Sequence, residues 1–332
     1  MTRAFLIVGP TATGKSEIAA DVAREVGAEI VSADAFQIYG GLDLLTAKPD
    51  ASTLAKAPHH LIGTVPFSEE MNAEKFRRLA SRAIDEINSR GKLAIAVGGS
   101  GLYIKALTHG LAPLPESSPR LREKLNAMSL NDLRLQLAEL DPEAARKIDI
   151  NNRRRVVRAL EICLLGGKPV SAQRERSSVA ASLCEAQTAG GNAIPANASH
   201  SEAATEQGST IPTRGVFVFR DREELYGRIN QRVENIFERG VIEEVCAVGT
   251  TSATASQMIG LREIRELLDG KMSLAQCIAE IQRATRRYAK RQLTWFRRQT
   301  NFFPLNLSFL THNEAVKWIS LRILSEAGTK DD

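Results

Sequence analysis

The clearest chemical signal in the sequence is a glycine-rich run that ends in lysine and serine, residues 9–16. It fits the pattern G-x-x-x-x-G-K-[ST] and stands between an apolar run and a segment with helical periodicity. In such a loop the backbone N–H groups and the helix N-terminus form an anion-binding nest. The lysine adds a positive charge, and the serine hydroxyl is placed to ligate Mg²⁺. The run predicts a polyphosphate site with Ser16 as the metal ligand. Its phosphate-binding residues are predicted to be Gly9, Pro10, Thr11, Ala12, Thr13, Gly14, Lys15 and Ser16.

A candidate general base stands at the end of the next strand-like run, residues 29–32, which leads into Asp34. Because the carboxyl ends of parallel strands meet at one edge of a sheet, we expect Asp34 close to the glycine-rich loop. A cap or turn aspartate is the alternative interpretation. An ordinary P-loop NTPase carries an acid at the end of another buried strand, but residues 93–97 lead instead into Gly98-Gly99-Ser100-Gly101. This difference weakens the NTPase hypothesis.

Strand-like and helical segments alternate through the first hundred residues. We predict strands at 4–8, 29–32, 93–97 and 216–219, and helices at 17–26 and 73–89. Such alternation, with the chemistry at the strand ends, predicts an α/β fold: a P-loop NTPase-like parallel sheet flanked by helices.

The pattern changes after residue 113, where residues 119–165 look wholly helical. We interpret residues 113–176 as a helical insertion into an α/β core formed by residues 1–112 and 214–332. Residues 177–213 contain no lysine, arginine or aromatic residue. Such a segment buries too little apolar surface to offset its ordering entropy, so we expect a disordered low-complexity loop.

Two basic segments are candidates for contact with phosphates. One begins at Arg153 in the insertion; the other is the helix expected at 275–298. Seven lysines and arginines fall within residues 283–298, which hold no acid. A solvated helix face normally mixes signs, so this segment favours binding to a nucleic-acid backbone. We expect an inward-facing apolar seam on this helix at Ile278, Ile281, Ala284, Tyr288 and Trp295.

Composition sets the broad class. The 332 residues are 43% hydrophobic and 25% charged with a net charge of +5, which suits a globular protein and only hints at a polyanionic partner. The four cysteines are scattered, so we expect reduced thiols. No apolar stretch approaches the roughly 20 residues that cross a bilayer, and the first strand lies too near the initiator methionine for a signal peptide. We expect a cytoplasmic monomer with no membrane partner.

A series of motifs resembles the tRNA dimethylallyltransferase family, the IPP transferases. The resemblance covers almost the whole chain except residues 177–213, and the ordered set is far more specific than any single motif. The motifs are residues 9–16, 31–39 (VSADAFQIY), 46–49 (TAKP), 58–62 (PHHLI), 97–107 (VGGSGLYIKAL), 155–161 (RVVRALE) and 285–297 (TRRYAKRQLTWFR).

The resemblance implies a prenyltransferase that takes dimethylallyl diphosphate as donor and uses Mg²⁺ as cofactor. The acceptor would be N6 of the adenosine 3′-adjacent to the anticodon, position 37, in tRNAs that read codons beginning with U. The glycine-rich loop would hold the diphosphate together with Arg222. Asp34 would remove the N6 proton, and Lys15 and Ser100 would complete the catalytic set.

The implied partner is the tRNA anticodon stem-loop, whose adenosine must be splayed out before its N6 is reached. The implied tRNA contacts are Asp34, Ala35, Phe36, Gln37, Ser100, Arg122, Arg154, Arg155, Val156, Val157, Arg158, Arg286, Arg287 and Arg291. The insertion 113–176 would also contact the tRNA. Departures from the family pattern are Ser100 for a usual threonine, Met71-Asn72 for Tyr-Ser, and Leu261 for an aromatic. His59 and His60 are interpreted as structural.

Three alternatives stay open at this point. A P-loop kinase or NTPase would leave the basic helices unexplained. An enzyme that prenylates free adenine nucleotides would not need a large basic insertion. A non-enzymatic RNA-binding protein would not need the glycine-rich loop together with Asp34.

Overall fold

The computed structural model describes residues 4–111, 114–172, 214–299 and 302–328. The chain forms two compact units, residues 1–110 with 208–332 and residues 111–207. The predicted low-complexity loop at 177–213 lies outside the described residues. None of the helices in the described ranges combines the length and apolar character that a bilayer span requires.

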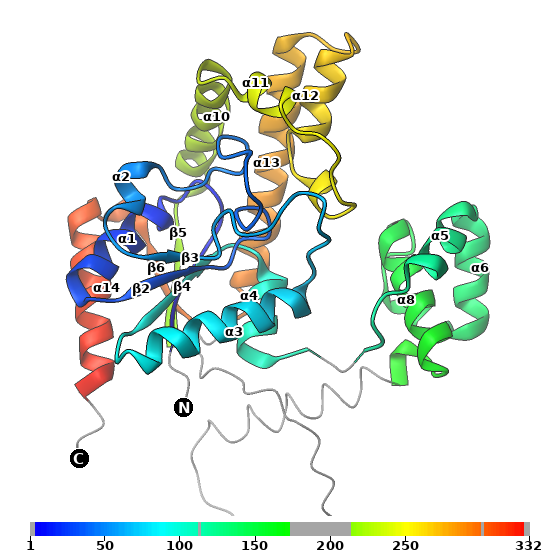
Figure 1. The fold of residues 1–332 in the computed structure, drawn as a ribbon, viewed down its shortest axis with the longest axis horizontal. Helices are drawn as coiled ribbons and strands as arrows, with labels where there is room; N and C mark the ends of the chain where they lie inside the picture. The colour runs from blue at the N-terminus through cyan, green and yellow to red at the C-terminus, as the bar shows by residue number, and fades with distance from the viewer. Residues whose placement is uncertain (1–3, 112–113, 173–213, 300–301, 329–332) are drawn as a thin grey trace, which may run out of the picture. The chain divides into compact units, whose positions relative to one another are not determined.

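A six-stranded sheet forms the centre of the larger unit (Figure 1). All of its pairings are parallel, and the strand order is β3-β2-β4-β1-β5-β6. Buried residues fill β1, β2 and β4 on both faces, as expected of a sheet covered by helices. The predicted parallel α/β sheet is confirmed. The strands are β1 (Ala4–Val8), β2 (Glu29–Ser32), β3 (His59–His60), β4 (Ala94–Gly98), β5 (Arg214–Phe219) and β6 (Phe303–Asn306).

Helices cover both faces of this sheet. On one face α1 (Lys15–Val26) packs beside α14 (His312–Gly328), and their apolar side chains share a core with Ile7 and Ile95 of the sheet. Elsewhere α3 (Ala73–Ser89) packs on α4 (Gly101–His109), where the rings of Phe76 and Tyr103 stack with centroids 4.1 Å apart. The short α2 (Ala51–Leu54) follows the segment after β2.

The remaining helices of this unit follow β5. Helix α10 (Arg222–Glu238) lies side by side with α13 (Leu274–Phe296), and α11 (Val241–Cys246) and α12 (Leu261–Leu268) connect them (Figure 1). Short 3₁₀ turns occur at Ala255–Gln257 and Leu307–Phe309. On α13 the buried positions are Cys277, Ile281, Ala289, Gln292 and Phe296. Of the predicted seam, Ile281 is buried and Ile278, Ala284, Tyr288 and Trp295 are half-buried, so the most deeply buried face is rotated slightly from the prediction.

In the smaller unit, four helices lie wholly within the described residues and surround a core of their own. Residues 119–165, predicted to be helical, form separate helices, because side chains at Ser118, Ser129, Asp141 and Asn152 accept backbone N–H bonds at the helix starts. Leu133, Leu137 and Leu160 belong to the core. The helices are α5 (Pro119–Ala127), α6 (Leu130–Leu140), α7 (Pro142–Lys147) and α8 (Arg153–Gly166).

Candidate active site

The glycine-rich loop joins β1 to α1 in a tight, internally bonded turn. Gly14 has φ 89°, a left-handed conformation that glycine adopts without a steric penalty. The Thr13 hydroxyl, which is fully buried, donates to the Pro10 carbonyl at 3.0 Å. The Lys15 ammonium donates to the same carbonyl at 3.1 Å. The loop is thus folded by its own side chains and places Lys15 and Ser16 at the first turn of α1.

A pocket opens beside this loop, next to the carboxyl ends of β1, β2, β3 and β4. Asp34 and Gln37 face it from the segment after β2, so the predicted base and the predicted phosphate loop share one cavity. Apolar side chains form another part of its wall. The lining residues are Lys15, Ser16, Ile30, Ser32, Asp34, Gln37, Pro49, His59, Ile62, Val97 and Gly98.

The Lys15 ammonium is held in a poorly solvated position. Burial lowers its pKa from 10.5 to about 8, with the Asp34 charge acting in the opposite direction and the Arg232 charge adding to the decrease. An anion bound beside Lys15 would favour the charged form again. This electrostatic environment suits a site whose natural occupant is negatively charged.

Asp34 is fixed by the backbone that follows it. Its Oδ1 accepts the N–H groups of Phe36 at 2.9 Å and Gln37 at 3.4 Å. The buried Ser100 hydroxyl accepts the Ala35 N–H at 3.0 Å. Ser100 therefore braces the turn that carries Asp34, and Asp34 keeps a second carboxylate oxygen for other partners.

The Gln37 side chain links this turn to the next loop. Its amide nitrogen donates to the Ala47 carbonyl at 2.8 Å, and its oxygen accepts the Ser32 hydroxyl at 3.2 Å. The loop is strained, since Leu42 and Ala47 both have φ near 50°. Non-glycine residues in this region of φ carry a steric cost and are found where a structure holds them for function.

His59 lines the pocket, although the sequence predicts a structural role for it. Its Nδ1 lies 2.7 Å from the Ala57 carbonyl, which can only accept, so Nδ1 carries the proton. Burial lowers the His59 pKa, which keeps the ring neutral near pH 7 and leaves Nε2 as an acceptor. His60 does have a structural role, because it contacts the buried Glu29 carboxylate at 2.8 Å.

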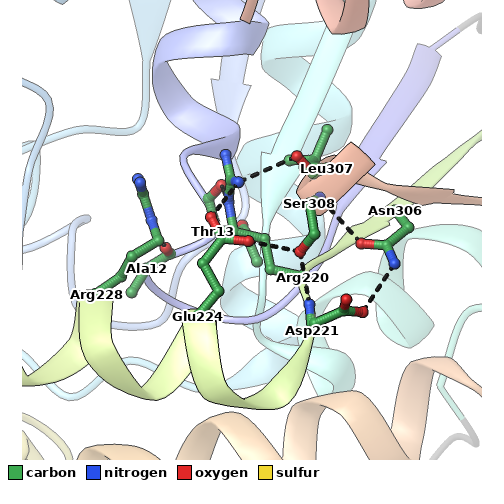
Figure 2. Close-up of polar contacts among 9 residues, drawn as sticks. All are labelled: Ala12, Thr13, Arg220, Asp221, Glu224, Arg228, Asn306, Leu307 and Ser308. Carbon is green, nitrogen blue, oxygen red and sulfur yellow. Dashed lines mark hydrogen bonds and ion pairs between the residues drawn. The ribbon is translucent and has the colours of Figure 1, made fainter. Parts of the chain in front are cut away.

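Three arginines contact the glycine-rich loop: Arg220, which follows β5, and Arg228 and Arg232 of α10. Arg232 donates to the Thr11 hydroxyl at 2.7 Å, while Arg220 and Arg228 donate to backbone carbonyls of the loop (Figure 2). Arg222, the arginine expected to contact the diphosphate, has a different environment. Its guanidinium lies 5.3 Å from the centroid of the Tyr226 ring.

Comparisons with known proteins agree on one family. The family model described as IPP transferase matches residues 37–299. A tRNA dimethylallyltransferase 1 of Citrifermentans bemidjiense is 39% identical over 91% of this chain and 92% of its own length. A tRNA dimethylallyltransferase of Akkermansia muciniphila is 36% identical over 98% of this chain and 99% of its own length.

The chain belongs to the IPP transferase family.

A solved structure supports the same assignment for the fold. The full-length tRNA isopentenylpyrophosphate transferase from Bacillus halodurans has a TM-score of 0.68 and 32% identity, with 99% of this chain and 98% of that chain covered. The predicted family and the predicted P-loop NTPase-like fold are therefore confirmed, and the protein is a prenyltransferase enzyme by family.

In this IPP transferase α13 reaches the glycine-rich loop through Gln292, a buried residue that the sequence interpretation missed. Its Oε1 accepts the Thr11 N–H at 3.0 Å, and its Nε2 donates to the Gly99 carbonyl at 2.8 Å. Gly99 is needed here, because a Cβ at this position would lie 2.3 Å from the Gln292 amide nitrogen. One side chain thus joins the loops that follow β1 and β4.

Tyr288 is a second residue of α13 near the site. Burial, followed by the charge of Asp34, raises its pKa, so its hydroxyl stays protonated and remains a hydrogen-bond donor. Trp295 packs close to Gly101, where an added Cβ would lie 2.7 Å from the indole. The aromatic side chains of this helix therefore anchor it near the loop that carries Ser100.

The basic residues of α13 fall into two groups. Arg287, Lys290 and Arg291 are exposed. Arg286 is half-buried and donates to the Asn230 side chain, and Arg283 is exposed but pairs with Glu280. Arg287, Lys290 and Arg291 are therefore better placed for a nucleic-acid backbone.

The predicted tRNA contacts in the smaller unit also differ in solvent exposure. Arg154 and Arg155 are exposed at the start of α8. The side chains of Val156 and Val157 are buried in the core of this unit, and their contact with tRNA stays a prediction.

The other two predicted contacts of this unit, Arg122 and Arg158, pair with Glu161, whose side chain is fully buried. Both arginines thus hold a buried carboxylate within their own unit.

The departures from the family pattern have structural roles in this chain. Asn72 caps α3 by accepting the Lys75 N–H at 2.9 Å, while Met71 and Leu261 are buried. Ser100 keeps the hydroxyl that a threonine would supply.

Proposed function

We propose that this protein transfers a dimethylallyl group from dimethylallyl diphosphate to N6 of adenosine 37, next to the anticodon, in tRNAs that read codons beginning with U. The observation that carries the proposal is the shared pocket. Lys15 and Ser16 of the phosphate loop, the Asp34 carboxylate and the apolar side chains of Ile30 and Ile62 line one cavity.

The two parts of this pocket match the two parts of the donor. The loop amides and Lys15 suit the diphosphate. Because the Lys15 ammonium is poorly solvated, a bound anion stabilises its charged form. Ile30, Pro49, Ile62 and Val97 suit a five-carbon hydrocarbon tail.

The chemistry requires one bond to form and one to break. The lone pair of the adenine N6 attacks the first carbon of the allylic diphosphate, and the carbon–oxygen bond breaks with its electron pair leaving on pyrophosphate. Lys15 and the loop N–H groups stabilise that departing charge. The free oxygen of Asp34 takes the N6 proton, and its other oxygen keeps the turn in place.

A divalent cation fits this site only together with the diphosphate. Among the described residues, no cluster of three or more histidine, cysteine, aspartate or glutamate side chains forms a metal site. Mg²⁺ commonly takes one or two protein oxygens and completes its shell with phosphate oxygens and water, and Ser16 would supply the protein oxygen. When bound, Mg²⁺ would neutralise charge on the leaving pyrophosphate.

The exposed cations support an RNA acceptor. We propose that Arg287 and Arg291 on α13, with Arg154 and Arg155 at the start of α8, contact the phosphates of the anticodon stem-loop. The segment 113–176 would then be a helical insertion that binds tRNA. The expected monomeric state and cytoplasmic location remain predictions.

The test is a transfer reaction carried out separately with each of two acceptors. Purified protein, Mg²⁺ and dimethylallyl diphosphate are incubated with an anticodon stem-loop or with adenosine monophosphate, and the nucleosides are identified by mass spectrometry. We expect dimethylallyladenosine from the stem-loop alone. Modification of the free nucleotide at an equal rate would instead indicate an adenine-nucleotide prenyltransferase.

A further inference from the structure

Two arginines donate to outward-facing backbone carbonyls of the glycine-rich loop. Arg220 Nε donates to the Thr13 carbonyl at 2.9 Å, and Arg228 Nε donates to the Ala12 carbonyl at 2.9 Å (Figure 2). Both guanidinium groups also flank Gly14, whose added Cβ would lie 3.5 Å from Arg228 Nη2 and 3.9 Å from Arg220 Nη2. The contacts are therefore to the loop's backbone, on consecutive residues.

These carbonyls belong to the part of the loop with unusual backbone geometry. Ala12 has φ 64° and Gly14 has φ 89°, so one non-glycine residue is held in the left-handed region. A backbone that turns its N–H groups toward an anion directs carbonyls away from it, and each carbonyl then needs a donor elsewhere. Arg220, which follows β5, and Arg228 of α10 supply those donors from positions far away in sequence.

Arg220 is itself held from several directions. Its Nη1 donates to the Leu307 carbonyl at 3.1 Å and pairs with Glu224 Oε1 at 2.6 Å (Figure 2). The other Glu224 oxygen accepts the Ser308 hydroxyl at 2.6 Å, and that hydroxyl accepts the Asp221 N–H at 2.8 Å. The Arg220 side chain is only 15% exposed. A continuous hydrogen-bonded brace therefore runs from Thr13 to the segment after β6.

We propose that Arg220, and to a smaller degree Arg228, are positioning residues that hold the glycine-rich loop in its anion-binding conformation before the donor arrives. The segment 306–308 is then a remote part of the diphosphate site, coupled to it through Glu224 and Arg220. This inference rests on the proposed function, in which the loop binds the diphosphate of the donor. Arg228 has the smaller role because it is more exposed and lacks the Glu224–Ser308 brace.

The test measures the affinity of the intact protein for inorganic pyrophosphate with Mg²⁺, and the KM values for both substrates. Arg220→Gln should weaken pyrophosphate binding about 10-fold, the usual effect of losing a hydrogen bond from a charged donor. It should raise the KM for dimethylallyl diphosphate equally and leave the KM for the stem-loop unchanged. Arg228→Gln should weaken binding about 3-fold. Arg239→Gln, at the exposed C-terminal end of α10, is the matched control and should bind like the wild type.

Two further variants separate positioning from charge and from folding. Arg220→Lys keeps the positive charge but cannot supply the same fork of donors, so it should restore affinity only in part. Ser308→Ala keeps Arg220 and removes the far end of its brace, and should weaken pyrophosphate binding about 2-fold with an unchanged circular dichroism spectrum.

The outcomes divide cleanly. Wild-type protein that does not bind pyrophosphate would contradict the proposed function itself. If the wild type binds, unchanged affinity in Arg220→Gln would overturn the inference, and so would full recovery by Arg220→Lys, since charge alone would then suffice. If Arg220→Gln does not fold, Ser308→Ala decides: wild-type affinity in that variant overturns the brace.

Discussion

The arginines of the larger unit differ sharply between the glycine-rich loop and the outer face of α13. Around the loop, Arg220 and Arg232 are committed to protein oxygens. On α13, Arg287 and Arg291 are exposed, with the Arg291 guanidinium 5.7 Å from the centroid of the Tyr288 ring. Arginines bound within the protein shape a site, whereas exposed arginines are available to an incoming polyanion. Net charge alone does not distinguish these two uses.

The largest change in activity is expected at Asp34, in the pocket beside the glycine-rich loop. Asp34→Asn keeps an oxygen to accept the Phe36 N–H, so the turn and the pocket should persist. Loss of the proton acceptor should lower kcat by roughly 10²–10⁴-fold with little change in either KM. Single-turnover transfer to the stem-loop measures this, and a wild-type rate would remove Asp34 from the mechanism.

The exposed arginines of α13 should control the affinity for RNA. Arg287→Gln with Arg291→Gln should weaken stem-loop binding on the order of 10-fold and reduce the log–log salt slope by about one per lost contact. Filter binding across a salt series gives both quantities. A double variant of Arg78 and Arg82, two exposed arginines at the same spacing on α3, is the control. Equal effects of the two double variants would show that general charge, rather than this helix face, holds the RNA.

Arg286 tests whether an arginine of α13 that is bound within the protein also contacts RNA, because its guanidinium donates to the Asn230 side chain. Arg286→Gln should lower the melting temperature and leave the salt slope of stem-loop binding nearly unchanged. Thermal unfolding and the salt series together test this. A change in slope as large as that of Arg287→Gln would place Arg286 among the RNA contacts.

The lowered pKa of Lys15 predicts that donor binding depends on pH. Its pKa of about 8 lies below the ordinary value, so in the free protein the ammonium is mostly charged at pH 7 and mostly neutral at pH 9. Pyrophosphate affinity should therefore fall about 10-fold between these two pH values. Calorimetry over this range measures the effect, and flat affinity would show that the Lys15 charge does not contribute.

The smallest effect concerns stability of the smaller unit. Glu161 is fully buried and accepts the Ser118 N–H at 2.8 Å besides pairing with Arg122 and Arg158. Glu161→Gln should reduce the free energy of unfolding by roughly 1–3 kcal/mol, a range that allows for the partial exposure of both arginines. Chemical denaturation measures it. No loss of stability would indicate that these arginines are available for RNA.

The sequence was most informative where the site is local. The glycine-rich loop and Asp34 each follow a strand, so the motif and the rule for parallel strands predict that they lie close together, and they line one pocket. The same reasoning identified β1, β2 and β4 within about a residue. It missed β6, an edge strand that contains Pro304, a residue that such strands tolerate.

The missed residues act over long separations in the chain. Gln292 lies 281 residues from Thr11, and Arg220 lies 207 residues from Thr13. Charge and helical periodicity made all the arginines look alike, because solvent exposure depends on which helix each one meets. The partners of Arg122, Arg158 and Arg286 could be identified only from the folded structure.

The central claim is that the glycine-rich loop binds the diphosphate of the donor. This diphosphate is released as intact pyrophosphate when the prenyl group is transferred to adenosine. The most direct measurement follows pyrophosphate release and modified adenosine together in one reaction of protein, dimethylallyl diphosphate and stem-loop. The account predicts one pyrophosphate for each dimethylallyladenosine formed, and neither product when the stem-loop is omitted. Release of inorganic phosphate from added ATP, without modification of the RNA, would instead show a P-loop phosphohydrolase.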